Sequence, residues 1–144
     1  MKVSYIMPMS KKIVIASDHA GFELKELLKK HFECTDLGTN SPDSVDYPDF
    51  GFKAAAEVAK NNCFGIIICG SGIGISIAAN RNPKIRAALC LNTDMARLAR
   101  QHNNANILAL GARLTTPQDA VEIAKTFFAT SFEGGRHQKR VDML

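Results

Sequence analysis

Short apolar runs alternate along the chain with longer segments in which apolar and charged residues recur at helical spacing. The short runs are rich in β-branched residues, which is typical of strands buried on both faces. They predict five strands, at Lys12–Ser17, Thr35–Leu37, Ile66–Ile68, Ile85–Leu91 and Asn106–Leu110.

The segments between these runs predict amphipathic helices. In the first, Gly21–Phe32, the leucines form an apolar face and the charged residues, Lys25 among them, are expected to be solvated. Thr93 and Asp94 are the expected N-cap of a later helix, and Pro117 suits the first turn of the last one. The other predicted helices are about Phe50–Lys60, a small-residue helix after Gly74, Thr93–Arg100 and Pro117–Phe128.

Strands that alternate with helices predict a parallel sheet covered on both faces, because the crossovers are right-handed. The expected fold is α/β, a three-layer αβα sandwich with a five-stranded, Rossmann-like sheet. Ligands bind such sheets beyond the carboxyl ends of the strands, where the winding direction reverses. In the common order that pairs the first strand with the second and third, Asp18 and His19 would lie beside Cys69.

The 144 residues predict one domain over residues 12–144, preceded by a loose extension at 1–11. Met7 and Met9 are alternative start positions within this extension. The extension has too short an apolar stretch for a secretory signal, and no apolar run approaches the roughly 20 residues that cross a bilayer. No membrane association is expected.

Cysteine spacing and charge narrow the functional classes further. The four cysteines, Cys34, Cys63, Cys69 and Cys90, show no C-x-x-C spacing, so neither a disulfide framework nor a zinc site is expected, and the cytoplasm is the natural compartment. The net charge of +4 is modest, and its densest basic cluster is at the C-terminus. It predicts a local anion site and no nucleic-acid partner.

The segment that follows the third strand carries the clearest chemistry. Cys69 ends the strand, and glycines at 70, 72 and 74 lead into a helical segment. Such a loop lets its backbone approach a ligand closely, and amides at a helix start favour bound negative charge. A helix start also favours the thiolate form of a cysteine. The pattern therefore predicts a nucleophilic or basic Cys69 acting on a small anionic substrate.

Two other interpretations remain open for this segment. A cysteine at a strand end is commonly inert packing. A glycine loop between strand and helix also binds nucleotides, and Asp94 could then hold a ribose hydroxyl. The loop lacks a third glycine of the dinucleotide pattern, because Ile75 occupies that position, and it lacks the Gly-Lys-Ser/Thr of a P-loop.

Several residues near other predicted strand and helix ends are further candidates. Asp18 and His19 could form an acid–base or anion-binding pair, or be an N-cap and an exposed histidine. His102 ends a helix, and lone loop histidines are more often solvated than catalytic. Tyr47 could line a pocket or only pack, and Arg113 follows a strand at the functional edge of the sheet.

The C-terminal segment places Arg136 and Arg140 one helical turn apart, after the pair Gly134-Gly135. If the segment is helical, both guanidinium groups can hold one phosphate. The alternative is a solvated basic tail.

Five motifs in this order resemble a known family: Ser-Asp-His-Ala-Gly-Phe at 17–22, Asp-Tyr-Pro at 46–48, Ile-Cys-Gly-Ser-Gly-Ile-Gly-Ile-Ser-Ile-Ala-Ala-Asn at 68–80, Arg-Gln-His-Asn at 100–103 and Gly-Gly-Arg-His-Gln-Lys-Arg at 134–140. The family is that of the sugar-phosphate isomerases, which holds type B ribose-5-phosphate isomerases and the galactose-6-phosphate isomerase subunits. The resemblance extends from about Lys12 to the end. It places the chain in the branch whose base is a cysteine, because Ile75 stands where another branch carries a glutamate.

The resemblance implies an aldose–ketose isomerase of the pentose phosphate pathway that works through a cis-enediolate, without metal or cofactor. Cys69 would be the base and Ser71 would shuttle protons, while His102 would open the furanose ring with Asp18 nearby. The resemblance further implies that the substrate is bound by His19, Tyr47, Gly70, Gly72, Ile73, Gly74, Asn103, Arg113, Arg136 and Arg140. Among these, His19, Arg136 and Arg140 would hold the phosphate.

The resemblance also implies a homodimer or a pair of dimers, in which each pocket is completed by the neighbouring subunit. A six-carbon substrate, allose or galactose 6-phosphate, is the alternative within the family. The size of the pocket near Tyr47 and the loop at 38–44 would distinguish the two classes of sugar.

Overall fold

The computed structural model describes residues 11–144. The expected extension at 1–11 and the alternative starts therefore lie, except for Lys11, outside the described residues. No helix in the described part is both long and apolar enough to cross a membrane.

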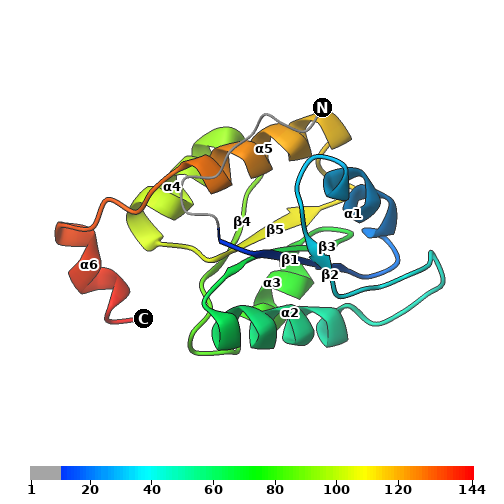
Figure 1. The fold of residues 1–144 in the computed structure, drawn as a ribbon, viewed down its shortest axis with the longest axis horizontal. Helices are drawn as coiled ribbons and strands as arrows, with labels where there is room; N and C mark the ends of the chain where they lie inside the picture. The colour runs from blue at the N-terminus through cyan, green and yellow to red at the C-terminus, as the bar shows by residue number, and fades with distance from the viewer. Residues whose placement is uncertain (1–10) are drawn as a thin grey trace.

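The structure is an α/β sandwich around one five-stranded parallel sheet, as the alternating pattern predicts (Figure 1). The strands lie in the order β2-β1-β3-β5-β4, so β1 pairs with β2 and β3 as expected, and β5 separates β3 from β4. The strands are β1 (Ile13–Ser17), β2 (Thr35–Asp36), β3 (Phe64–Cys69), β4 (Ala87–Leu89) and β5 (Ile107–Gly111).

Helices cover both faces of the sheet (Figure 1). Helices α1, α4 and α5 bury their apolar faces against one side, and α2 and α3 pack on the other. Helix α6 lies beyond α4, beside the edge at which the strands begin. The helices are α1 (Phe22–Lys29), α2 (Tyr47–Asn61), α3 (Ile73–Ala79), α4 (Thr93–Asn103), α5 (Pro117–Ala129) and α6 (Arg136–Val141).

Among the boundaries that differ from the predictions, three have a clear local cause. Helix α2 begins at Tyr47, three residues early, since Pro48 fits its first turn. The N-cap of α4 is Asn92, whose side-chain oxygen accepts from the amide of Met95 at 2.8 Å, and not Thr93 or Asp94. Strand β4 is shorter than predicted, and the Asn80 side chain hydrogen-bonds both the amide and the carbonyl of Ala87.

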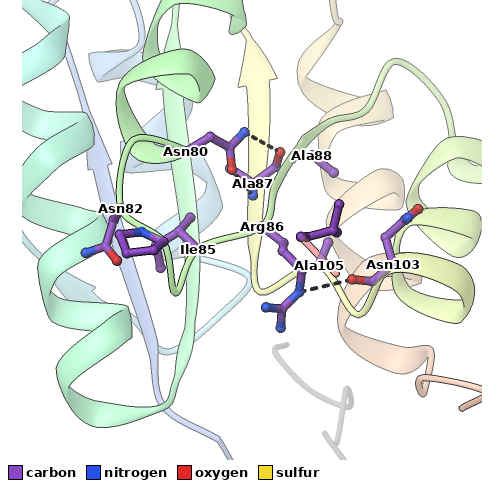
Figure 2. Close-up of a pocket in the computed structure, with 10 residues that line it drawn as sticks. Asn80, Asn82, Ile85, Arg86, Ala87, Ala88, Asn103 and Ala105 are labelled. Atoms are coloured by element: carbon purple, nitrogen blue, oxygen red, sulfur yellow. Dashed lines mark hydrogen bonds between the residues drawn. The ribbon is translucent and has the colours of Figure 1, made fainter. Parts of the chain in front are cut away.

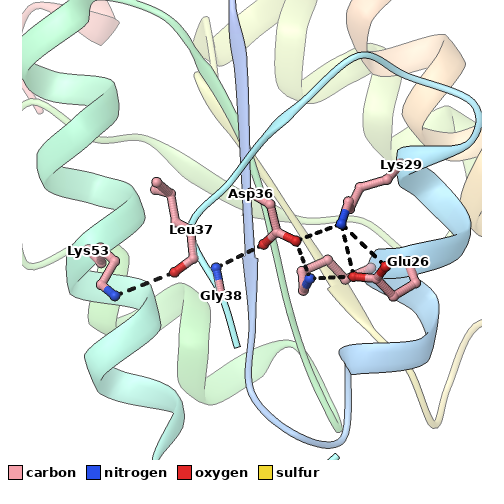
Figure 3. Close-up of polar contacts among 7 residues, drawn as sticks. Glu26, Lys29, Asp36, Leu37, Gly38 and Lys53 are labelled. Carbon is pink, nitrogen blue, oxygen red and sulfur yellow. Dashed lines mark hydrogen bonds and ion pairs between the residues drawn. The ribbon is translucent and has the colours of Figure 1, made fainter. Parts of the chain in front are cut away.

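Lys25, expected to be solvated, is fully buried. Its Nζ lies 2.7 Å from both a Glu26 oxygen and Asp36 Oδ2, and Lys29 donates to the same two carboxylates. Asp36 also accepts from the amide of Gly38 at 2.9 Å, so this ionic cluster joins α1 to the turn that follows β2 (Figure 3). Asp36, on the strand that follows α1, compensates the charge of the buried lysine, and the helical pattern of α1 alone does not reveal this contact.

The cluster should make stability depend on Lys25. Burial by itself would raise the pKa of Asp36, but the bonds from Lys25, Lys29 and the Gly38 amide hold it below its ordinary value. Lys25→Ala removes a fully buried side chain and leaves Asp36 paired with Lys29 alone among the lysines of the cluster, so it should lower the free energy of unfolding by about 2 kcal/mol. Urea denaturation measures this loss. Lys30→Ala, at an exposed position next to the same helix, should change it by less than about 0.5 kcal/mol.

Candidate active site

The carboxyl ends of β1 and β3 lie side by side, as the expected sheet order requires. Ser17 pairs with Ile68 in the parallel register, and the amide of Asp18 donates to the carbonyl of Ile68 at 3.2 Å. The residues after the two strands, Asp18 and His19 on one side and Cys69 on the other, therefore meet at one edge of the sheet. This confirms the predicted placement.

Cys69 is held with its sulfur against the backbone of the glycine loop. The side chain is only 4% exposed, and its Sγ accepts a hydrogen bond from the amide of Gly72 at 3.2 Å. Gly72 has a φ of +79°, a conformation that L side chains rarely adopt, and it directs this amide back toward the sulfur. An N–H donor at this position stabilises negative charge on sulfur, so the geometry suits a thiolate.

The two glycines on either side of Gly72 make room for functional side chains. A Cβ on Gly70 would lie 2.7 Å from Nη1 of Arg113, and a Cβ on Gly74 would lie 2.5 Å from Cζ of Tyr47. The guanidinium and the phenol ring thus rest directly on the loop that begins at Cys69. Arg113 itself is fixed by its amide, which donates to the carbonyl of Gly70 at 2.9 Å.

Part of the loop backbone remains available to a ligand. The amide of Ile73 donates to Oγ of Ser71 at 3.1 Å, and that of Gly72 is used by Cys69. The amides of Ser71 and Gly74 have no acceptor within the described residues. Ile75, by contrast, points into the core and is fully buried.

Asp18 and His19 are both tied to neighbouring backbone. The carboxylate of Asp18 is buried and accepts from the amide of Gly21 at 3.1 Å, at the start of α1. Nδ1 of His19 accepts from the amide of Val45 at 3.2 Å, which anchors the loop between β2 and α2 to the site.

The remaining candidates lie at the opposite edge of the sheet. His102 and Asn103 end α4, which returns the chain from the carboxyl edge to the start of β5. Within the chain the length of β3 separates them from Cys69, about 16 Å for its six residues. The expected proximity of His102 to Asp18 is therefore not found within a single chain.

Helix α6 carries Arg136 and Arg140 and confirms the helical spacing predicted for the tail. It packs on α4 through His137, which is only 8% exposed. The rings of His137 and His102 are stacked, with centroids 4.2 Å apart and planes 14° apart. The end of α4 and helix α6 thus form one group of residues at the edge where the strands begin, the α4–α6 group. It contains His102, Asn103, Arg136 and Arg140.

A hollow of ≈ 480 Å³ lies at this same edge (Figure 2), and Cys69 is not among the residues that line it. Asn103 contributes to its wall, and the Asn103 carbonyl accepts from Nε of Arg86 at 3.1 Å. The same Nε also donates to the carbonyl of Asn104 at 3.0 Å. Arg86 therefore binds the last carbonyls of α4, where a cation also complements the helix dipole.

The sequence did not predict that three further residues would contact the end of α4 or helix α6. They are Arg86, Arg100 and His137. Arg100 is buried over the rings of Phe64 and Phe127, and its Nη1 donates to the carbonyl of Ala105 at 2.7 Å. No sequence pattern indicates that Arg100 lies over Phe64 and Phe127, because these residues belong to elements that are distant along the chain.

The other buried cysteines lack the surroundings of Cys69. Burial raises the pKa of Cys90 to about 12, and burial also raises that of Cys63. These thiols remain protonated near neutral pH, so they are poor nucleophiles and bases. The inert-packing interpretation therefore fits Cys63 and Cys90.

Comparison with known proteins identifies the family of this chain. The model of the family described as Ribose/Galactose Isomerase matches residues 13–144. The chain belongs to this family. The chain is 45% identical over 144 residues to a probable ribose-5-phosphate isomerase B from Mycoplasma genitalium, and the alignment covers 94% of this chain and 95% of the relative. It is 42% identical over 140 residues to ribose-5-phosphate isomerase B from Escherichia coli, covering 93% and 94%.

Solved structures from the ribose/galactose isomerase family superpose closely. The Thermotoga maritima ribose 5-phosphate isomerase has a TM-score of 0.88 at 55% identity, over 93% of this chain and 97% of that one. A Mycoplasma genitalium ribose-5-phosphate isomerase B with bound ribulose-5-phosphate has a TM-score of 0.90 at 44% identity, over 93% of each chain. The nucleotide-binding alternative finds no support, since Asp94 is bonded to Arg97 and follows β4, which β5 separates from the glycine loop.

The glycine loop predicts a contrast between two alanine substitutions. A Cβ on Gly72 would lie 2.8 Å from the carbonyl carbon of Leu110 in addition to its unfavourable φ, so Gly72→Ala should cost at least about 2 kcal/mol of stability. Gly74→Ala meets only the end of the Tyr47 side chain, which can turn away toward solvent, and should cost less than about 1 kcal/mol. Urea denaturation of both variants measures the difference. Equal losses would contradict this assignment of the two contacts.

Proposed function

We propose that this protein is an aldose–ketose isomerase that interconverts ribose 5-phosphate and ribulose 5-phosphate. The observation that carries the proposal is the arrangement around Cys69, whose sulfur accepts a backbone hydrogen bond beside Arg113 and Tyr47. The names of the relatives, one of them solved with ribulose-5-phosphate, point to the same substrate. We further assign the reaction to the pentose phosphate pathway in the cytoplasm, where four free cysteines stay reduced.

In the proposed mechanism Cys69 moves a proton between C1 and C2 of the open-chain sugar. The thiolate removes the proton from one carbon and returns it to the other, and negative charge develops on the sugar oxygens of the enediolate. The unpaired amides of Ser71 and Gly74 lie in the same loop and can donate to those oxygens. Preorganised donors of this kind are worth about 3–4 kcal/mol each in acyl-transfer enzymes. The Ser71 hydroxyl then shuttles protons between the oxygens.

The proposed site is completed by a second subunit. His102 would open the furanose ring, Asn103 would line the pocket, and Arg136 and Arg140 would bind the phosphate together with His19. In one chain His102 lies a strand length away from Cys69, and α6 lies beside His102. Only a neighbouring copy of the chain can bring these groups to the Cys69 loop.

An exposed apolar surface around the edge strand β4 supports this dimer. Ile73 and Ile77 are 51% and 59% exposed on α3, which packs beside β4. On the other side of β4, Met95 and Leu98 are exposed on α4, and His102 follows them at helical spacing. Exposed apolar patches of this kind mark interaction sites. Burying this surface between two copies would direct His102 toward the neighbour.

The role of Cys69 can be tested by substitution. Cys69→Ala should lower kcat for ribose 5-phosphate by about a thousandfold or more, because it removes the base, while Cys34→Ala should remain active. A coupled spectrophotometric assay with EDTA present measures both variants, and circular dichroism checks that each is folded. Substantial turnover by folded Cys69→Ala would rule out Cys69 as the base.

The same assay with allose 6-phosphate and galactose 6-phosphate tests the six-carbon alternative. We expect the largest kcat/KM with ribose 5-phosphate. A larger value with either hexose phosphate would change the assigned substrate but not the reaction class.

Sharing of the pocket predicts complementation between two defective variants. Arg140→Ala should raise KM by about tenfold to a hundredfold, because it removes a charge-assisted bond to the phosphate. After subunit exchange with Cys69→Ala, a heterodimer has one site with both defects and one intact site. Activity at substrate concentrations below the Arg140→Ala KM should therefore recover in the mixture. No recovery despite mass-spectrometric proof of exchange would place the tail in its own subunit's site.

A further inference from the structure

The stacked pair of His102 on α4 and His137 on α6 indicates a role for His137 that the proposed function does not include. His137 projects from α6, is nine-tenths buried, and lies with its ring parallel to that of His102. Its Nε2 is 3.4 Å from Oε1 of Glu133, in the segment between α5 and α6. Glu133 is held in turn by its own amide, which donates to the carbonyl of Gln101 at 3.1 Å. The segment before α6 is thus bonded both to His137 on α6 and to Gln101 on α4, next to His102.

The same three side chains bring potential metal-ligand atoms within 4.8 Å of one another. An ion bound by two imidazoles must lie near the plane of both rings, because the nitrogen lone pairs lie in those planes. Planes only 14° apart at a centroid separation of 4.2 Å meet far from the rings. The rings are therefore arranged for stacking and not for sharing one ion.

We propose that His137 is a positioning residue for His102. Its flat, uncharged ring supports one face of the His102 imidazole at the end of α4, and so fixes the direction in which His102 enters the neighbouring subunit's pocket. This inference rests on the proposed function, in which His102 opens the sugar ring. Glu133 contacts His137 through its side chain and Gln101 through its backbone amide.

The charges around His137 favour its neutral form. Burial lowers the pKa of His137, and the neighbouring His102, Arg136 and Arg140 lower it further, while Glu133 opposes them. A depressed pKa means that the folded chain binds this proton less readily than the unfolded chain does. The packed arrangement is therefore fully stable above the ordinary histidine range and loses stability as pH falls from there toward the lowered pKa. Protonation would place a cation against His102 and two arginines.

The test compares His137→Ala, His137→Phe and the control Gln138→Ala. Gln138 is exposed on the same helix, and within the described residues its side chain bonds only that of Asp142. Loss of the supporting ring should lower kcat for ribose 5-phosphate by about tenfold to a hundredfold in His137→Ala, with little change in KM. His137→Phe keeps a flat uncharged ring and should restore most of the turnover, and Gln138→Ala should match the wild type.

A second measurement separates this positioning role from general damage. Exchange of the C1 hydrogen of ribulose 5-phosphate with solvent needs the Cys69 base but not ring opening, because ribulose 5-phosphate cannot form a furanose. Exchange should therefore persist in His137→Ala while net isomerisation falls. The decline of kcat at acid pH should also be shallower in His137→Phe, which cannot be protonated. If His137→Ala does not fold, the comparison of His137→Phe with the wild type still measures this change in pH profile.

Three results would overturn the inference: wild-type turnover in folded His137→Ala, equal loss of exchange and isomerisation in that variant, or an unchanged acid decline in His137→Phe. A wild-type enzyme that shows neither isomerisation nor exchange would instead overturn the proposed function. The two failures are therefore distinguishable.

Discussion

The common direction of the five strands is the constraint on which the rest of the structure depends. Every strand ends at the same edge of the sheet, so Asp18, Cys69 and Arg113 meet there although almost a hundred residues separate the first from the last. The same constraint requires each helix that follows a strand to carry the chain back. Residues in the last turn of such a helix, such as His102 in α4, therefore lie at the opposite edge of the sheet.

Because these groups lie at opposite edges of the sheet, the proposed active site needs residues from two copies of the chain. One edge provides a base, loop amides and an arginine, and the other provides a histidine and two further arginines. Both groups are well ordered by internal contacts: the first by the glycine loop, the second by Arg86, Arg100 and the histidine stack. Two copies related by a two-fold axis would pair each edge with its complement, which is the simplest way for both groups to act on one substrate.

Close approach of backbones is the second condition for the site. A Cβ at Gly111 would collide with the carbonyl of Ser71, so the end of β5 can lie against the loop only without a side chain there. Arg113 follows two residues later and folds over Gly70. The ionic cluster of Lys25 and Asp36 plays a comparable part on the other side, because it holds the turn at Gly38, whose carbonyl accepts from the amide of Ser17. These contacts set the shape of the edge at which Asp18 and Cys69 lie.

The sequence by itself determined the strands, most helices, the α/β class and the Cys69 loop, because each depends on residues close together in the chain. Periodicity identifies buried faces, and Pro117 and the glycines mark ends and turns through their own backbone preferences. Only the tertiary structure decided the burial of Lys25, the position of β5 between β3 and β4, and the stack of His137 on His102. Each of these depends on a partner far away in sequence, and its energy arises from packing and desolvation at that contact. The sequence named His102 and Cys69 as candidates, but only the tertiary structure showed which groups hold them, His137 against the first and the Gly72 amide against the second.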